Sequence, residues 1–424
     1  MNPIVTYRGP VGVRAVELTK PLEALENLSS YDHVRVFFLW NDAPMAMADI
    51  PNHGRTVSAA RLRDVAVEFC YYQIVQKALV AHLSADAAAS APDDVALSVV
   101  VATLDRPDLL QRCLESLRAQ ATVRPLEIVV VDNNPASGVT PPVVAGFPGV
   151  VLVNETRRGL SYARNAGITT SRGEIIACAD DDVVIPRGWA DAIVAPFADP
   201  TVMAVTGNVL PLELETRAQR LYEAYGGLGR GFHRRTVDGA WFRSFRAAVP
   251  TWTLGATANA AFRAQIFSDP TIGLMEESLG AGMPAGVGED TYLFYRILKA
   301  GHRMVYEPSA YLWHQHRSTI PELHRQLAAY SRGHVAYHLT TLVRDGDWRA
   351  LWRLAALARW DLRQMLRWAW HSVRSRRTYP LSLVLLETWG HVMGPWAYWE
   401  SRRRVRRQGT GHRAQGTGPS ELTE

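Results

Sequence analysis

The chain has 424 residues, a length that predicts two or three structural units rather than a single core. Hydrophobic residues make up 47% of it and charged residues 21%, which are ordinary globular values and exclude wholesale disorder. The net charge of +5 is unevenly placed, because residues 343–424 carry 15 Arg and no Lys against 7 acidic residues. The rest of the chain is therefore slightly acidic, and we expect no nucleic-acid partner.

Cysteine usage and apolar stretches predict a cytoplasmic protein. Cys70, Cys113 and Cys178 are far apart and form no CxxC pair, which argues against a disulfide framework or a thiolate metal site. Met1–Lys20 lacks the apolar core of a signal peptide. The best apolar stretch, Leu381–Trp399, is interrupted by a glutamate and a histidine, which would be costly at a bilayer centre. We therefore expect no membrane-spanning helix.

Residues 1–83 are predicted to form a small N-terminal α+β unit. Val34–Trp40 has the β-branched and aromatic content of a strand, and Ser58 is placed to cap a long helix. The small, polar and Pro-containing residues 84–94 are predicted to be a linker.

Residues 95–342 have the pattern of an α/β domain. Leu97–Thr103 and Glu127–Val131 are continuous apolar runs, typical of strands that are buried on both faces, and Pro107–Gln120 between them has helical spacing. Further strands are expected at Val150–Asn154, Glu174–Ala179, Val202–Thr206 and His302–Tyr306. This alternation predicts a mostly parallel sheet flanked by helices.

In such sheets the chemistry lies beyond the carboxyl ends of the strands, where this chain places Asp180, Asp181 and Asp182. Three adjacent carboxylates repel one another, and a bound cation such as Mg²⁺ or Mn²⁺ would reduce this repulsion. The alternative is a solvated acidic turn. Asp132, after another strand, has two interpretations as well: it accepts hydrogen bonds from a nucleobase or ribose, or it caps the following turn.

Two later segments also carry polar groups that have open interpretations. Glu289 and Asp290 begin an apolar helical run. Carboxylates are favoured at the start of a helix by the helix dipole alone, but a catalytic base that activates a hydroxyl could occupy the same position. His314 and His316 point to the same side of an extended segment, so their spacing does not choose between them. Arg164, one turn inside a helix, either contacts phosphate or ribose oxygens or lies on a surface helix.

Seven short segments between about Leu97 and Arg317 follow one another in a specific order: LSVVVATLDRPDLL, VVVDNN, RGLSYARNAG, ADDD, GATANAAF, GED and WHQH. Each one is weak by itself, but together and in this order they resemble the family 2 glycosyltransferases, a large bacterial group built on the GT-A fold. The resemblance covers about half of the chain. It implies a GT-A-type α/β domain over residues 95–342.

The resemblance also implies roles for individual residues. A nucleotide sugar would be bound by Thr103, Asp105, Asp132, Arg164, Asn165, Asp180, Gly255, Asn259 and Glu289. Asp180 and Asp182 match the outer positions of the family's DxD motif and would hold Mg²⁺ or Mn²⁺. His314 would be an additional metal ligand, with His316 as the alternative. Asp290 of the GED motif would be the catalytic base.

These roles imply an inverting, metal-dependent glycosyltransferase that moves a sugar from a UDP- or dTDP-sugar to a hydroxyl acceptor, which could be lipid-linked. The product would belong to a cell-surface glycan, a glycolipid or a natural product. A nucleotidyltransferase is an alternative, but it would want a Gly-rich phosphate loop after the first strand, and Thr103–Pro107 has no glycine. An inactive glycan- or lipid-binding protein is a second alternative, although it would not need the carboxylates.

Residues 343–407 are predicted to form an Arg/Trp-rich helical segment, and residues 408–424 a disordered tail. Trp348–Arg377 reads as one helix with an apolar stripe, and eight of the chain's 13 Trp lie between Trp348 and Trp399. Such a segment suits the surface of an anionic membrane, on the inner face of the cell membrane. Alternatively, the stripe docks on the catalytic domain with its Arg residues in solvent.

Overall fold

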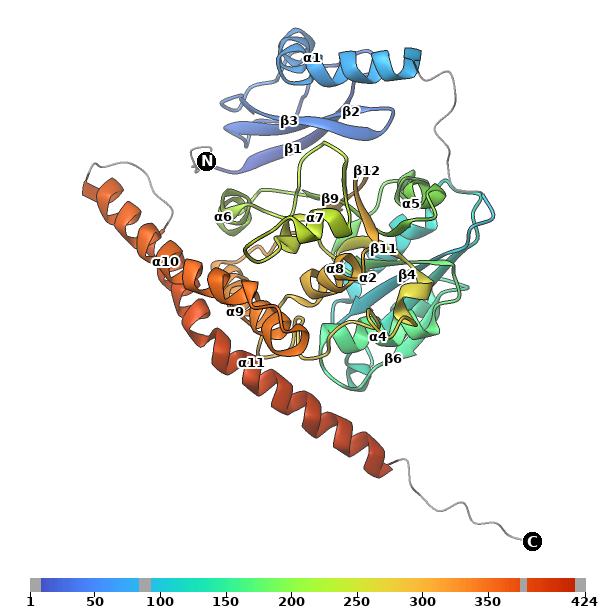
Figure 1. Ribbon diagram of the computed structural model, residues 1–424. Helices are drawn as coiled ribbons and strands as arrows, with labels where there is room; N and C mark the ends of the chain where they lie inside the picture. Colours follow the sequence, from blue (N-terminus) through green and yellow to red (C-terminus); the bar gives the residue numbers. More distant parts are fainter. Residues whose placement is uncertain (1–8, 84–92, 374–379, 416–424) are drawn as a thin grey trace.

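The larger sheet of the computed structural model, which describes residues 9–83, 93–373 and 380–415, runs through the middle of the chain (Figure 1). Its strands are β4 (Leu97–Thr103), β5 (Leu126–Asp132), β6 (Val151–Asn154), β7 (Ile175–Asp180), β8 (Val183–Val184), β9 (Val202–Pro211), β10 (Arg235–Val237), β11 (Asn259–Arg263) and β12 (Arg303–His314). They lie in the order β10-β12-β9-β11-β7-β4-β5-β6, and β8 pairs with β12. Six of these described strands run in one direction, and β8, β10 and β11 run in the other. The prediction of a mostly parallel α/β sheet is confirmed.

Helices cover both faces of this sheet. They are α2 (Pro107–Arg118), α3 (Thr140–Ala145), α4 (Leu160–Thr170), α5 (Trp189–Val194) and α8 (Glu289–Lys299). Val99 and Val101 of β4 belong to a core shared with α2, α3 and α5, whereas Val100 belongs to a second core shared with α4 and α8. Because successive strand residues point to opposite faces, this continuous apolar run needs cover on both sides.

β12 is longer than the predicted strand His302–Tyr306. Pro308 lies inside β12, at a shift in register between Glu307 and Tyr311, instead of ending the strand. A bulge of this kind tolerates a proline, which cannot donate to the ladder. The strand therefore continues to His314, which pairs with Val183 of β8 directly after the acidic triplet.

The N-terminal unit has a sheet of its own, formed by β1 (Val11–Glu17), β2 (His33–Trp40) and β3 (Ala43–Pro51) and covered by α1 (Ala59–Leu83). It contacts the larger domain through an apolar cluster in which Phe37 and Leu39 of β2 pack with Leu210 and Tyr311. Most of the predicted linker, residues 84–92, lies outside the described residues.

The remaining helices lie mainly in the C-terminal third of the chain. They are α6 (Arg217–Tyr225), α7 (Gly239–Arg243), α9 (Ile320–Asp345), α10 (Arg349–Val373) and α11 (Leu381–Gln415), with 3₁₀ turns η1 (Pro135–Ser137), η2 (Ala195–Ala198), η3 (Thr251–Thr253) and η4 (Ala264–Phe267). α11 crosses α9 closely, because a side chain at Gly394 would meet Val335 at 2.4 Å. Residues 408–424 were expected to be disordered, but α11 continues to Gln415, and residues 416–424 lie outside the described part.

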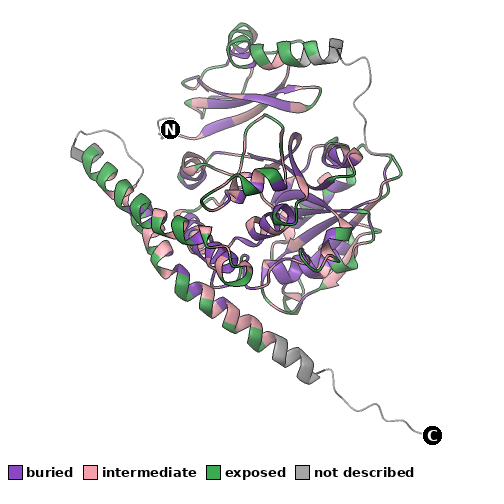
Figure 2. Ribbon diagram, viewed as in Figure 1, coloured by how far each residue is buried: buried purple, intermediate pink, exposed green. Residues whose placement is uncertain are grey.

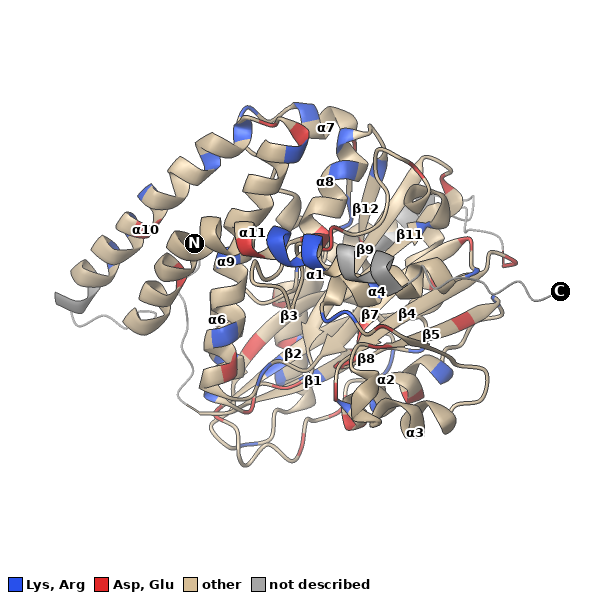
Figure 3. Ribbon diagram, turned by 90° about the horizontal axis from the view of Figure 1, so that it is seen from below, with Lys and Arg blue, Asp and Glu red and all other residues tan. Residues whose placement is uncertain are grey.

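The apolar stripe predicted on α10 faces outward. Leu351 and Leu362 of this stripe are 54% and 59% exposed, whereas Leu357, on the other side of the helix, is buried. Figure 2 shows exposed residues along the length of α10, and Figure 3 shows basic residues, all of them Arg in this helix, recurring along it. The alternative in which this stripe docks on the catalytic domain is therefore wrong. In the ranges that the structure describes, no helix is long and apolar enough to cross a membrane.

Candidate active site

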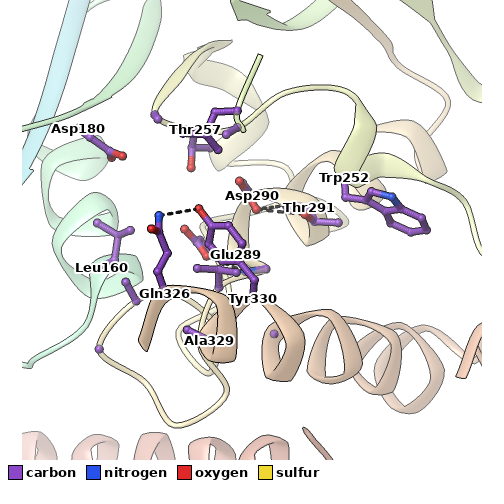
Figure 4. Close-up of a pocket in the computed structure, with 18 of the residues that line it drawn as sticks. Leu160, Asp180, Trp252, Thr257, Glu289, Asp290, Thr291, Gln326, Ala329 and Tyr330 are labelled. Carbon is purple, nitrogen blue, oxygen red and sulfur yellow. Dashed lines mark hydrogen bonds between the residues drawn. The ribbon is translucent and has the colours of Figure 1, made fainter. Parts of the chain in front are cut away.

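A pocket of about 850 Å³ begins at the carboxyl ends of β4 and β7 and extends to the C-terminal helices. Its acidic end is lined by Asp180, Asp181, Asp182 and His314, and its middle by the 255–258 loop and the start of α8. Figure 4 shows Asp180, Thr257, Glu289, Asp290, Gln326 and Tyr330 around this space. The pocket therefore lies where the strand-end argument places the chemistry.

The acidic end has the geometry of a cation site. One ligand atom from each of Asp180, Asp182 and His314 lies within 4.8 Å of the other two. Oδ1 of Asp182 is buried, has no hydrogen-bond partner among the described residues and lies 3.2 Å from Nε2 of His314. Carboxylate oxygens and an imidazole nitrogen are ligands that Mn²⁺ accepts, and Mg²⁺ prefers the oxygens. The residues present fit a divalent cation.

Arginines offset part of the negative charge of the triplet. Arg106 contacts Asp181 at 3.1 Å and Asp182 at 3.2 Å, and Arg317 lies 3.5 Å from Asp182. Burial opposes ionisation of Asp182, but His314, Arg317 and Arg106 outweigh burial and lower its pKa. Burial and the charge of Asp182 raise the pKa of Asp181 to about 6. Oδ2 of Asp181 accepts a hydrogen bond from Thr103 at 2.8 Å, so this carboxylate is held by protein groups.

Arg164 of α4 joins the acidic end to the middle of the pocket. One of its guanidinium nitrogens donates to Oδ1 of Asp180 at 2.7 Å, and the other donates to Glu289 at 2.8 Å and to Thr257 at 2.6 Å. Burial lowers the pKa of Arg164, and the two carboxylates outweigh burial and raise it. A buried cation between two carboxylates thus ties the end of β7 to the first turn of α8.

The two carboxylates of the GED segment differ in their surroundings. Glu289 is buried, and burial, together with the charge of Asp290, raises its pKa to about 7 although Arg164 lowers it. Asp290 is half-buried and lines the pocket. Its Oδ1 accepts the backbone N–H of Thr291 at 2.6 Å, and no hydrogen bond between described residues uses its Oδ2. Asp290 is therefore the carboxylate of this segment that faces the pocket with an available oxygen.

The structure distinguishes the two histidines of the WHQH segment. His314 lines the pocket and faces Asp182, whereas His316 places its Nε2 2.9 Å from Glu223 of α6. His316 lies behind His314, with 3.1 Å between their Nδ1 atoms. The geometry thus brings His314 to the acidic cluster and leaves His316 outside it.

Two residues that were assigned to the nucleotide sugar make hydrogen bonds within the protein. The amide of Asn165 exchanges two hydrogen bonds with the backbone of Met275. The amide of Asn259 accepts from Trp189 and donates to the carbonyl oxygens of Asn208 and Ala310. Both asparagines are buried and neither lines the pocket. Both hydrogens of the Asn259 amide and one of those of Asn165 are used by the protein itself, and the assignment of these residues to donor binding stays a prediction.

Asp105 and Asp132 do not line the pocket either, whereas Thr103 and Gly255 do. Asp105 is exposed and accepts two hydrogen bonds from Asn134. Asp132 is buried, and its Oδ1 accepts the backbone N–H of Asn134, as the turn-capping interpretation requires. Its Oδ2 has no hydrogen-bond partner among the described residues.

Sequence reasoning missed most of the pocket's helical end, which α9, α10 and α11 supply. Tyr330, Trp360, Glu387 and His391 line it, together with Trp252. It also gave no role to Arg106, which lies within the first quoted motif, or to Arg317, which directly follows the last. The only signal for the helical end was the clustering of Trp in the C-terminal part of the sequence.

Comparisons with known proteins agree with this site. Residues 98–269 match the family described as "Glycosyl transferase family 2". The chain is 28% identical over 244 residues to a pre-mycofactocin glycosyltransferase of Mycobacterium tuberculosis. This alignment covers 57% of this chain and 47% of that protein. It is 30% identical over 246 residues to the succinoglycan biosynthesis protein ExoO of Rhizobium meliloti, which covers 54% of this chain and 63% of that protein. The chain thus spans between about half and two thirds of the length of these curated relatives.

A solved structure also aligns with the chain, although weakly. It is that of the mannosyltransferase PcManGT from Pyrobaculum calidifontis, with 19% identity and a TM-score of 0.41 over 82% of this chain and 83% of that chain. So low a score supports no inference about function. The family match and the named relatives agree on one part of the chain: residues 98–269 are similar to the family 2 glycosyltransferases.

Proposed function

We propose that this protein transfers a sugar from a nucleotide-sugar donor to an acceptor hydroxyl, with inversion at the sugar carbon and with Mg²⁺ or Mn²⁺ held by Asp180, Asp182 and His314. The observation that carries this proposal is that the acidic cluster and Asp290 line one pocket, in which Arg164 connects Asp180 to Glu289, the neighbour of Asp290. The names of the relatives support glycosyl transfer, and the DxD-like cluster supports the need for a metal.

The chemistry divides between the two sides of the sugar carbon. A divalent cation supplies positive charge that stabilises the departing diphosphate. Asp290 accepts the proton of the attacking hydroxyl through Oδ2, while the Thr291 N–H holds Oδ1 and fixes the carboxylate's orientation. Direct displacement needs only this one base and inverts the sugar carbon. Thr103 and Arg106 keep Asp181 engaged, which leaves Asp180 and Asp182 for the metal.

The acceptor would enter from the helical end of the pocket. Aromatic rings of Tyr330, Trp252 and Trp360 lie there beside the polar groups of Gln326 and Glu387. Aromatic faces and hydrogen-bonding side chains together suit a hydroxyl-rich compound such as a sugar. The donor would be a UDP- or dTDP-sugar. A role in a cell-surface glycan, glycolipid or natural product agrees with the names of the relatives, which refer to mycofactocin and succinoglycan.

The test is a thermal-shift panel of UDP- and dTDP-sugars, each with and without Mn²⁺, on the full chain. We expect one donor to raise the melting temperature in the presence of Mn²⁺ by more than either component does alone. Asp182→Asn should remove that synergy. Asp191→Asn, which changes an exposed acidic residue outside the pocket, is the matched control and should keep it. If no donor shifts the wild type, the result favours the alternative of an inactive binding protein.

Peripheral attachment to an anionic membrane is part of this proposal. The outward face of α10 carries Trp352, which is 63% exposed, and α11 exposes Trp389, Trp396 and Trp399 at helical spacing. Arginines accompany these rings, and Arg403 lies over Trp399 with 5.5 Å between its guanidinium carbon and the ring centroid. Exposed Trp with Arg suits the interface of anionic lipid, where each basic residue contributes about 1 kcal/mol.

Vesicle sedimentation tests this attachment. The full chain should sediment with phosphatidylglycerol vesicles and much less with phosphatidylcholine vesicles. Trp352→Ser combined with Trp396→Ser should reduce the bound fraction. Tyr72→Ser, at a 69% exposed aromatic residue of α1, is the matched control and should not. Equal recovery of all three proteins in the supernatant would remove the membrane from the proposal.

A further inference from the structure

A continuous series of polar contacts leads from the acidic cluster to the N-terminal unit. His314 Nε2 lies 3.2 Å from Asp182, and its Nδ1 lies 3.1 Å from Nδ1 of His316. His316 Nε2 lies 2.9 Å from Oε1 of Glu223, whose Oε2 accepts from Arg35 of β2 at 2.7 Å. Arg35 in turn makes two hydrogen bonds to Asp49 of β3. These side chains link three elements that are far apart in the sequence.

The chemistry of each group fixes where the ring protons lie. An ionised carboxylate only accepts hydrogen bonds, so Glu223 requires the proton of neutral His316 to be on Nε2. Nδ1 of His316 is then an acceptor, and the facing Nδ1 of His314 must be the donor. When His314 is neutral, as a metal ligand must be, its lone pair is therefore on Nε2, the atom that faces Asp182. A nitrogen lone pair beside a buried carboxylate oxygen that lacks a hydrogen-bond partner is suited to a shared cation.

Because Arg35 contacts one oxygen of Glu223 and His316 contacts the other, residue 223 must accept a hydrogen bond on both sides. The guanidinium of Arg35 can only donate, so the group at position 223 must accept from it. A carboxylate can accept from Arg35 and from His316 at once. A glutamine cannot: with its oxygen turned to Arg35, its NH₂ would face His316, and the protons of both histidines would have to reverse. His314 would then point an N–H at the metal position.

We propose that Glu223, held by Arg35 of the N-terminal unit, is a positioning residue for the metal site, acting through His316 to keep the His314 proton on Nδ1. This inference rests on the metal dependence proposed above. It gives residues 9–83 a role in the activity of the larger domain. The unit is fixed at this place by packing as well, since Phe37 contacts Trp313, the neighbour of His314, with 5.3 Å between ring centroids.

The test is the affinity of the full metal-free chain for Mn²⁺, measured by titration calorimetry without any donor sugar. Substitutions of groups that orient a metal ligand typically cost about 10–100-fold in affinity, and we expect a loss of this size for Glu223→Gln. Glu213→Gln is the matched control, because Glu213 contacts Gln219 and Gln315 nearby but does not touch the series. Its Mn²⁺ affinity should equal that of the wild type.

The double variant Arg35→Met with Glu223→Gln separates positioning from a merely structural role. Without the arginine, the glutamine can turn its oxygen to His316, so the double variant should bind Mn²⁺ more tightly than Glu223→Gln alone. A structural role predicts the opposite, since a second ion pair is lost. The inference is overturned if the wild type and Glu223→Gln bind Mn²⁺ with equal affinity. It is also overturned if the double variant has the same melting temperature as Glu223→Gln and does not bind Mn²⁺ more tightly. A wild type that binds no Mn²⁺ overturns the proposed metal dependence as well.

Discussion

The two ends of the pocket are built in different ways. At the acidic end, Asp181, Asp182 and Arg164 are buried and contact groups of opposite charge. At the helical end, Trp360 is 36% exposed, His391 contacts Asp361 at 3.0 Å, and Arg353 lies over the ring of Trp252 at 5.0 Å. Charges fixed in a buried network are already oriented for a charged ligand, whereas exposed rings can adapt to a neutral one.

The two ends also differ in where they lie relative to the segment that matches the family. The matched residues 98–269 supply the acidic end, apart from His314 and Arg317. The helical end comes mostly from α9, α10 and α11, which lie beyond that segment, although Tyr225 and Trp252 lie within it. Substitutions in the acidic half and middle should therefore change the chemical step or the stability, and substitutions at the helical end should change acceptor use.

The largest effect is expected for Asp290→Asn, at the junction of the two ends. Removing a general base typically costs 10²–10⁴-fold in rate, and we expect a loss of about 10³-fold in sugar transfer. The substitution keeps the shape of the side chain, so the Mn²⁺-dependent thermal shift by the donor should stay close to that of the wild type. Release of the nucleoside diphosphate measures the rate.

The matched control is Asp345→Asn, at a carboxylate that pairs with Lys299 at the far end of α8. It should retain nearly full activity. If Asp290→Asn keeps a substantial fraction of the wild-type rate, Asp290 is not the base and the division of chemistry between the two ends fails.

Sequence patterns were sufficient for the sheet and for the acidic triplet because both depend on local order. The apolar run of β4 reports burial on both faces, and the residues that follow a strand must lie at the edge of the sheet. The hydrogen bonds of Asn165 and Asn259 could not be predicted, because their amides contact Met275 and Trp189, which are distant in sequence. No motif contains such a contact.

Two further features could not be predicted from the sequence: which way the apolar stripe of α10 faces, and which histidine joins the acidic cluster. An amphipathic helix presents the same stripe whether it docks or faces out, and only packing against α9 and α11 decides. Two histidines at i, i+2 lie on the same side of a strand. The metal ligand could therefore be identified only from the contacts of His314 with Asp182 and of His316 with Glu223.

A smaller effect is expected on stability from Glu289, which lies between the two ends. Its folded-state pKa of about 7 is raised above the unfolded value of 4.5, so the fold favours its protonated form. This contribution is fully present below pH 4.5 and is lost as the pH rises through about 7. At about 1.4 kcal/mol per pKa unit, the loss is about 3 kcal/mol.

Glu289→Gln should therefore flatten the dependence of stability on pH. Melting temperatures of the wild type and the variant, taken between pH 4.5 and pH 7.5, give the difference between the two. Asp181, whose pKa is also raised, contributes equally to both proteins and cancels. If the melting temperatures of the two proteins instead change in parallel over this pH interval, Glu289 is ionised throughout it. The ion pair with Arg164 would then outweigh the effect of burial on its pKa.

The smallest effect is expected for Trp360→Ala at the helical end. Loss of a half-exposed aromatic face from a sugar site typically costs about 1 kcal/mol, which corresponds to a rise of about fivefold in the acceptor KM. The donor-dependent thermal shift and the rate of donor hydrolysis in water should be unchanged, because neither depends on this end. Methyl glycosides serve as soluble acceptors. Trp352→Ala, on the outward face of the same helix and not in the pocket, is the control and should leave the acceptor KM unchanged. A fall in donor hydrolysis for Trp360→Ala would mean that the two ends act as one site, and the comparison between them would lose its basis.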